Sequence, residues 1–450
     1  MSKQVVIIGG GISGLSVLHQ LKQKFKDRPD IQVLLIEKSP QPGGAIQSQI
    51  SHGCLFETGP ESFLTNKPST LQLIKDLELE NDLVPAQPQA KRRYLNINEK
   101  LHVLPMNPVQ FFGFKPLGFT QKLRLFGEMF VPGKSRDEET VYEFGCRRFG
   151  KGITEYFLDA FVTGIYGGDI RRLNLKATFP LLYDLEQKHG SVIRGMFSKC
   201  KEKKTQETPP TKKSGLGQLC SLRYGMGQLV DMISRKYREC IHAGEEVLTL
   251  TKAAEGYIVE TNKAKYFADH VFLCAPAYGA APVLKTISQT LAANLERIDY
   301  AAITVVGLVY DRSAFSNIPE GFGYLVPSGE DKKILGVIFS SNIFVNRSDA
   351  KYFLFRIMIK NADQPDEAVE LAQDEITAMF KVTQAPAHTF VANWPKGIPQ
   401  YTTEYQAMLA SIEAELAQLK NINIVANYLG GVGVNDCTQN AQNMVTNLVI

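Results

Sequence analysis

Three glycines near the N-terminus have the spacing of a phosphate-binding loop. Gly9, Gly11 and Gly14 form a GxGxxG pattern in VVIIGGGISGLS, directly after a short apolar run. Glycines at these positions permit a tight turn and a close approach of the backbone to a pyrophosphate. The positive end of a helix that begins near Ser13 would stabilise the phosphate charge. The loop therefore predicts dinucleotide binding.

A carboxylate lies where the ribose of such a nucleotide is expected. Glu37 ends the second apolar run, VLLIE, and is placed to accept hydrogen bonds from ribose hydroxyls. The same charge would repel a 2′-phosphate, which argues against NADP. Gly43 and Gly44 follow, and then the segment FETGPESF (56–63). These small residues let the backbone pass close to an extended, buried cofactor, which favours FAD over NAD; a pair of ordinary loops is the alternative.

The sequence contains no catalytic or metal-binding spacing. Its seven histidines show no ligand pattern, and no GxSxG nucleophile motif occurs. We therefore expect no metal and no catalytic side chain, but a cofactor that performs the chemistry itself. The seven cysteines are scattered, odd in number and without a CxxC pair, which indicates reduced thiols in a cytoplasmic protein.

Two segments carry features suited to a substrate. AKRRYLNINEKLHVLP places Lys91, Arg92 and Arg93 before an expected hairpin, and arginine suits bidentate carboxylate binding. A solvated charged face is the alternative. FVTGIYGGD (161–169) is a glycine-rich aromatic turn, consistent with backbone lying against a flat ligand or with a helix end.

Composition and hydropathy patterning predict a folded globular α/β protein of several domains. The 450 residues are 44% hydrophobic and 21% charged, and the net charge of +4 is too small to indicate nucleic acid. No apolar run is long enough for a membrane-spanning helix. A strand, turn, helix, strand unit opens the chain, and a helix is expected over 70–84. Residues 199–213 predict a solvated loop.

Helical periodicity over 111–183 and returning strand patterns divide the chain into three parts. The predicted boundaries are as follows: a Rossmann-like FAD-binding domain of residues 1–85, 214–283 and 421–450, an inserted mixed-sheet substrate domain of 86–107 and 284–420, and an inserted helical domain of 108–213.

Several stretches together resemble the protoporphyrinogen oxidases, FAD enzymes of haem synthesis in the flavin amine oxidase superfamily. In chain order they include VVIIGGGISGLS, GPESFL, KRRYL, FVTGIYGGD, GFGYLVPS, WPKGIPQY and GGVGVNDC. The resemblance implies an FAD domain of the p-hydroxybenzoate hydroxylase type, a substrate domain and a helical membrane-associating domain. It also implies a six-electron oxidation of protoporphyrinogen IX to protoporphyrin IX by successive hydride transfers to non-covalent FAD, with dioxygen as acceptor.

The resemblance assigns residues to both ligands. The implied cofactor contacts are Gly9, Gly11, Ile12, Ser13, Gly14, Glu37, Lys38, Gly43, Gly44, Ala45, Gly59, Pro60, Glu61, Ser62, Val247, Trp394, Val432, Gly433 and Val434. The implied substrate contacts are Arg93 with a propionate, the backbone of Gly164, and the apolar walls Leu325 and Phe339. The chain departs from the family at Ala45, where an arginine or large residue is frequent, and at Glu404 and Tyr405, where many members read Gly-His.

The glycine-rich stretch near the C-terminus, NYLGGVGVNDCTQNAQ, is expected to complete the same cofactor site. Asn435 or Asp436 can cap a helix whose Ala441, Val445 and Leu448 face the core. Backbone amides at that helix start would lie beside the N1 and C2 edge of the flavin, where negative charge gathers on reduction.

The sequence leaves several hypotheses about partners and substrates undecided. Apolar residues among Lys115, Lys122 and Arg124 in the segment 108–132 suggest peripheral contact with the cytoplasmic face of a membrane, or else an ordinary core. A homodimer and hand-over to ferrochelatase are further partner hypotheses. The substrate alternatives are coproporphyrinogen III, which carries two more propionates, an amine or a carotenoid. A binding module without catalysis is the remaining alternative.

Overall fold

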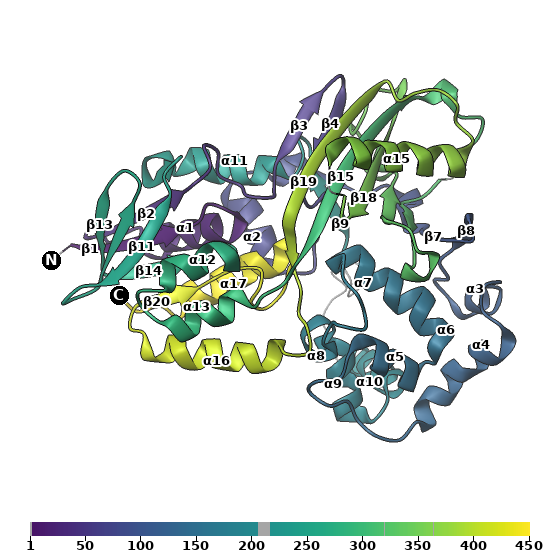
Figure 1. The fold of residues 1–450 in the computed structure, drawn as a ribbon, viewed down its shortest axis with the longest axis horizontal. Helices are drawn as coiled ribbons and strands as arrows, with labels where there is room; N and C mark the ends of the chain where they lie inside the picture. The colour runs from purple at the N-terminus through teal and green to yellow at the C-terminus, as the bar shows by residue number, and fades with distance from the viewer. Residues whose placement is uncertain (1, 206–216, 319, 363) are drawn as a thin grey trace.

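A computed structural model describes residues 2–205, 217–318, 320–362 and 364–450, with the backbone alone over 200–205. The fold is mixed α/β: a parallel sheet covered by helices adjoins a long, mostly antiparallel sheet, and a group of helices lies beside the second sheet (Figure 1). Among the described residues no helix is both long and apolar enough to cross a bilayer. The six described cysteine side chains are free thiols, as predicted, and Cys200 lies outside the described side chains.

The parallel sheet is built from chain segments that lie far apart in sequence. Its strand order is β10 (Ile241–Ala243), β2 (Ile31–Glu37), β1 (Lys3–Ile8), β14 (His270–Leu273) and β20 (Ile422–Ile424). Alternate residues of β1 are buried on opposite faces, so that helices must cover both. Helices α1 (Ile12–Lys24), α2 (Pro68–Asp76), α11 (Gly227–Lys236) and α17 (Val434–Thr446) share one core. Helices α12 (Ala277–Leu284), α13 (Gln289–Glu296) and α16 (Tyr405–Gln418) share the other.

The second sheet has seven strands and two unlike faces. Its order is β19 (His388–Pro399), β15 (Tyr300–Asp311), β18 (Tyr352–Lys360), β17 (Ile334–Ile338), β16 (Gly323–Leu325), β7 (Tyr94–Ile97) and β8 (Lys100–Val103). On its outer face, Phe355 and Ile357 pack against helix α15 (Pro365–Phe380). The opposite face, which we call the inner face, carries Leu354, Arg356 and Met358, since side chains alternate along a strand.

The helical group follows β8 in the chain. Its helices are α3 (Pro108–Phe112), α4 (Phe119–Phe126), α5 (Val141–Arg148), α6 (Lys151–Ile153), α7 (Asp159–Tyr166), α8 (Leu175–Thr178), α9 (Pro180–His189) and α10 (Val192–Thr205). A fully buried arginine joins them, because Arg148 donates to Glu186 and lies 3.5 Å from Glu128. Breaking a buried ion pair leaves an uncompensated charge, so this cluster fixes the mutual placement of these helices.

Three small sheets complete the fold. They consist of β11 (Val247–Lys252), β12 (Tyr257–Thr261) and β13 (Lys265–Ala268); β3 (Ser48–Ser51) and β4 (Cys54–Glu57); and β5 (Phe63–Leu64), β9 (Leu219–Leu222) and β6 (Leu83–Pro85). The hairpin β3–β4 stands beside the long strand β19, so that it adjoins the seven-stranded sheet (Figure 1).

Two predicted segments differ from the structure. The helix expected over 70–84 ends at Asp76, because Glu78 adopts a left-handed conformation with φ of 58° that stops the helix. The loop predicted over 199–213 is helical as far as Thr205, within α10, and its part from 206 onward lies outside the described residues.

Candidate active site

The N-terminal glycine loop connects β1 to α1 and leaves space for a ligand. Gly9 has φ of +107°, and a Cβ there would lie 2.8 Å from the backbone nitrogen of Ala275. A Cβ at Gly11 would meet no described atom within 4 Å, so the outer side of the loop is open. No described side chain caps the α1 N-terminus at Gly11. Uncapped amide groups beside open space fit a pyrophosphate.

The predicted ribose acid lies beside this loop. The Glu37 carboxylate accepts hydrogen bonds from Gly10 N at 2.6 Å and from Ser39 N at 2.7 Å. These contacts hold the carboxylate at the C-terminal edge of the parallel sheet, where nucleotides bind in folds of this type. Lys38 instead forms an exposed ion pair with Glu246 at 2.7 Å, next to Val247 at the start of β11.

The second pair of glycines packs against the first loop. Gly43 N donates to Gly10 O at 2.8 Å, and a Cβ at Gly44 would lie 3.5 Å from Gly11 Cα. Ala45 follows, and its carbonyl accepts a hydrogen bond from Thr58 Oγ1 at 2.9 Å. The pair at 43 and 44 therefore packs directly against the first glycine loop, and its contact with the cofactor stays a prediction.

The loop Gly59–Ser62 is held by two long side chains from the inner face of the seven-stranded sheet. Trp394 Nε1 donates to Thr58 O at 2.9 Å, and the Arg356 guanidinium donates to Gly59 O. Ser221 Oγ donates to Glu61 O at 2.9 Å from the other side. These contacts occupy the carbonyl groups of Thr58, Gly59 and Glu61 and so fix the path of the loop.

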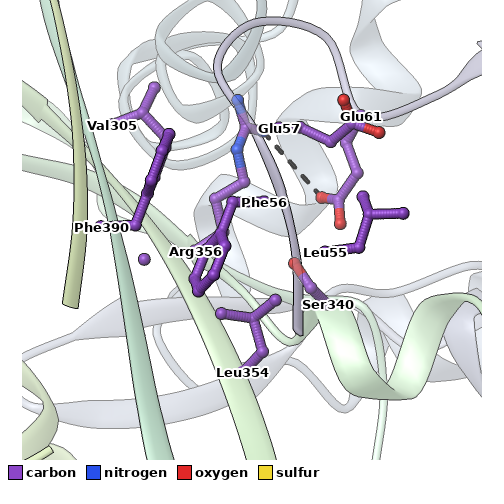
Figure 2. A pocket seen from close by; sticks show the side chains of 10 residues that line it. Leu55, Phe56, Glu57, Glu61, Val305, Ser340, Leu354, Arg356 and Phe390 are labelled. Atoms are coloured by element: carbon purple, nitrogen blue, oxygen red, sulfur yellow. Dashed lines mark ion pairs between the residues drawn. The ribbon is translucent and has the colours of Figure 1, made fainter. Parts of the chain in front are cut away.

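Arg356 also lies next to a small cavity behind this loop. Its guanidinium is 3.9 Å from the buried Glu61 carboxylate, and Figure 2 shows the two side chains pointing toward one another. The cavity measures about 10 Å³, which is room for one water molecule. Arg356 Nε, Glu61 Oε2 and Ser340 Oγ line it without hydrogen-bond partners among the described residues. This void is a water-sized site beneath the loop, too small for a cofactor or an organic substrate.

The C-terminal glycine loop enters the same region and ends at the start of α17. Gly433 is the N-cap residue, and its N–H donates to Asp436 Oδ2 at 3.2 Å. Asp436 is thus the capping acid, while Asn435 binds Leu64 O at 2.7 Å. Ala441 and Val445 face the core shared with α1, as predicted. The two glycine loops therefore belong to helices that pack together, although more than 400 residues separate them.

The substrate residues predicted from sequence divide between the two faces of the seven-stranded sheet. Leu325 on β16 pairs with Leu95 on β7, so Arg93, two residues before Leu95, lies on the same inner face. A Cβ at Gly164 of α7 would lie 3.0 Å from a methyl carbon of Leu325. The structure therefore places Arg93 and Leu325 on one face of the sheet, and Gly164 packs against Leu325.

Phe339 does not join them. Its side chain is 0% exposed and packs on the outer face against Tyr324, Phe355 and Phe380. The expected apolar wall at this position therefore corresponds to a core residue beneath α15. Strand alternation in GVIF explains why Phe339 points away from the pocket. Val337 and Phe339 share the outer face, whereas Ile338 points to the other face.

Arg93 has the electrostatic character of a carboxylate-binding side chain. Its guanidinium lies 4.9 Å from the centre of the Phe322 ring and forms no ion pair with any described residue. The Arg93 side chain is exposed to water on one side. Enough protein surrounds it on the other side that desolvation lowers the pKa of the Arg93 guanidinium. Arg93 therefore offers an uncompensated positive charge.

Sequence reasoning missed Arg356 and the hydroxyl contacts of Tyr401 and Tyr405. Arg356 is the charged residue in the apolar run YFLFRIMI. Because a charge inside a buried strand requires a polar partner, this pattern alone could have identified Arg356 as a candidate site residue. Tyr405, one of the departures from the family pattern, is buried and donates to Tyr428 O at 2.9 Å. Its neighbour Glu404 forms an exposed ion pair with Arg297.

Comparisons with known proteins show the family of this chain. A family model for flavin containing amine oxidoreductases matches residues 12–448. Coproporphyrinogen III oxidase of Bacillus subtilis is 28% identical, over 97% of this chain and 95% of its own. Human protoporphyrinogen oxidase is also 28% identical, over 98% of this chain and 97% of its own. A crystal structure assigned to a protoporphyrinogen oxidase of Exiguobacterium sp. 255-15 has a TM-score of 0.83, covers 99% of this chain and 98% of that chain, and is 23% identical.

The family match and the loop geometry identify the cofactor. The match confirms a flavin, and the open pyrophosphate loop beside a carboxylate is that of the dinucleotide form, FAD. Since the matched region spans nearly the whole described chain, the protein belongs to the family of flavin containing amine oxidoreductases.

Proposed function

We propose that this protein oxidises protoporphyrinogen IX to protoporphyrin IX with FAD as the cofactor and dioxygen as the electron acceptor. The observation that carries the proposal is the inner face of the seven-stranded sheet, where Arg93, which forms no ion pair with any described residue, lies on the same face as Leu325, the residue that Gly164 packs against. A flat apolar ring with carboxylate arms matches that surface. Full-length similarity to relatives named for porphyrinogen oxidation supports the same substrate class.

The chain's own residues hold and orient both ligands. FAD supplies hydride acceptance when bound. Gly9, Gly11 and the α1 amide groups would hold its pyrophosphate, and Glu37 its adenosine ribose. The 59–62 loop and Val432–Val434 would flank the flavin ring. Arg93 would hold a propionate, so that the porphyrinogen lies with one meso carbon toward the flavin.

We further propose that the fold divides as the sequence suggested, with an FAD domain of the p-hydroxybenzoate hydroxylase type. The five parallel strands all lie within 1–85, 214–283 and 421–450, and the strands of the large sheet within 86–107 and 284–420. The helices from α3 to α10 lie within 108–213. This agreement supports the proposed boundaries.

A peripheral membrane role, with the protein in the cytoplasm or on the cytoplasmic face of a membrane, is proposed for the helical part. Exposed apolar side chains gather on α3, α4 and the turns around them. These residues, which we call the apolar patch, are Met106, Val109, Phe112, Phe119, Leu123, Phe126 and Phe130. Such a surface suits the interface of a bilayer, from which a poorly soluble porphyrinogen could enter. The basic residues of this segment contribute less positive charge to the surface than expected, because Lys122 is buried and donates to Phe112 O.

Porphyrin fluorescence during turnover tests the function and its substrate. We expect the wild-type protein to oxidise protoporphyrinogen IX faster than coproporphyrinogen III, and Arg93→Ala to lower kcat/KM by about 10- to 150-fold. This range follows from about 1.5–3 kcal/mol for a hydrogen bond to a charged group. The exposed neighbour Arg92→Ala is the matched control and should change little.

The same assay separates the alternatives. Equal rates on the two porphyrinogens would contradict the choice of substrate, which matters because one relative is named for coproporphyrinogen III. Full activity of Arg93→Ala would contradict the carboxylate clamp, and no porphyrin formation by the wild type on either porphyrinogen would favour an amine or a carotenoid substrate.

A further inference from the structure

Two stacked tyrosines hold the C-terminal glycine loop from one side. Tyr401 and Tyr405 are 1% and 3% exposed, and their ring centres are 4.4 Å apart. The Tyr401 hydroxyl donates to Asn427 O at 2.6 Å and accepts from Gly431 N at 3.1 Å. Tyr405 donates to Tyr428 O at 2.9 Å. The two hydroxyls therefore fix both ends of the turn that leads into residues 432–434.

Both phenols stay protonated in the folded protein. Burial raises the pKa of Tyr405 to about 12 and that of Tyr401 further in the same direction. A neutral phenol can donate to a carbonyl and accept from an amide at once, as Tyr401 does. The contacts with the loop are therefore independent of pH over the working range.

The same segment also contacts the helix that carries Gly164. Gln400 Nε2 donates to Tyr166 O at 2.9 Å, and the Tyr166 ring meets the Tyr401 ring edge-on with centres 5.8 Å apart. Residues 400–405 thus touch α7 on one side and the glycine loop on the other. They connect the two structures that we assign to substrate and flavin.

We propose that Tyr401 and Tyr405 are positioning residues that hold the backbone of residues 432–434, including the N–H groups of Val432 and Val434, against the flavin ring and set its distance from α7. This inference rests on the proposed placement of the flavin at Val432–Val434. Oriented amides and the α17 N-terminus stabilise negative charge, which the reduced flavin carries. Loss of either hydroxyl should therefore weaken the binding of reduced flavin more than that of oxidised flavin.

The test compares three single tyrosine-to-phenylalanine variants of the holoenzyme. Tyr401→Phe and Tyr405→Phe each remove one hydroxyl from the loop. Tyr257→Phe is the matched control, because Tyr257 is buried and donates to Lys420 O at 2.6 Å, away from the loop. Midpoint potential by dye equilibration, the visible flavin spectrum and thermal unfolding are measured for each.

We expect similar losses of thermal stability in all three variants but a change in potential in two. In Tyr401→Phe and Tyr405→Phe, the binding of reduced flavin relative to oxidised flavin should be about tenfold weaker. For a two-electron couple, this makes the midpoint potential about 30 mV more negative. Unchanged potentials and spectra in both would overturn the proposal. An equal shift in Tyr257→Phe would also overturn it, since general loosening would then be the cause.

Two further outcomes keep the inference separate from the proposed function. If a variant loses its flavin, titration of its apoprotein with FAD should show weaker binding than for Tyr257→Phe, and equal dissociation constants would contradict the proposal. None of these measurements uses a porphyrinogen. Shifted potentials in a protein that oxidises no porphyrinogen would support the positioning role and reject the substrate.

Discussion

Buried charges below the 59–62 loop are the most unusual side chains of the site. Glu57 is buried, accepts from Ser48 Oγ at 2.6 Å and from Met226 N at 2.8 Å, and lies 3.7 Å from the Arg347 guanidinium. Burial outweighs these favourable contacts and raises its pKa from 4.5 to about 7. A buried carboxyl that is half protonated near neutral pH makes the stability of this region depend on pH.

The direction of that dependence follows from proton binding. The folded protein binds the Glu57 proton more tightly than the unfolded chain does, so the resulting stabilisation is complete below about pH 4.5 and is lost as pH rises through about 7. The difference corresponds to at most about 3 kcal/mol. We expect Glu57→Gln to remove this loss, so that its free energy of unfolding falls less between pH 5 and 8.

Urea unfolding of the holoenzyme at several pH values measures this effect. The wild type and Glu57→Gln should differ most at pH 8 and least near pH 5. Parallel curves over the whole range would show that Glu57 does not titrate in this window.

At the scale of elements, the site depends on how α17 begins. Gly431 adopts φ of +122°, and a Cβ there would lie 2.6 Å from the Asp436 carboxyl carbon, which belongs to the capping acid of the helix. We expect Gly431→Ala to strain this turn by about 1–3 kcal/mol and to release flavin. The ratio of flavin to protein absorbance after gel filtration measures the retained cofactor.

Gly190→Ala is the matched control for backbone strain. Gly190 also has positive φ, at +69°, but a Cβ there would meet no described atom within 4 Å. It ends α9, away from the flavin loops. If both variants retained the same amount of flavin, the proposed role of the C-terminal loop in cofactor binding would be wrong.

Local patterns identified most elements, whereas the faces of the large sheet required the structure. Helix α15 and strands β15 to β18 follow from periodicity and composition, as does the hairpin β7–β8. Strand β19 was not expected, because Pro395 and Gly397 interrupt its pattern; an edge strand tolerates both. Phe339 was assigned to the pocket because similarity gives a position but not the direction in which a side chain points.

At the scale of the whole molecule, the apolar patch and the substrate residues lie in neighbouring parts. Phe114 and Leu117 of the 108–132 segment face the core around Leu95. Phe119 and Phe126 are exposed on α4. The expectation of an ordinary core therefore holds for the buried side chains, and we propose that the exposed ones contact lipid close to the substrate face of the sheet.

Flotation with anionic liposomes tests the membrane contact. We expect the wild-type protein to co-float, and a Phe119→Ser, Phe126→Ser double variant to remain at the bottom of the gradient with normal activity on dispersed substrate. Ile50→Ser removes an exposed apolar side chain from the hairpin β3–β4 and should float like the wild type. Failure of the wild type to float, with activity intact, would reject the membrane role.

The central claim is that a porphyrinogen reduces the flavin of this protein. Mixing the purified holoenzyme with protoporphyrinogen IX under strictly anaerobic conditions tests it in one step, with flavin absorbance as the readout. We predict rapid bleaching of the oxidised flavin band, recovery of the band when oxygen is admitted, and formation of fluorescent porphyrin. A flavin band that persists in the presence of protoporphyrinogen IX would contradict the proposed function.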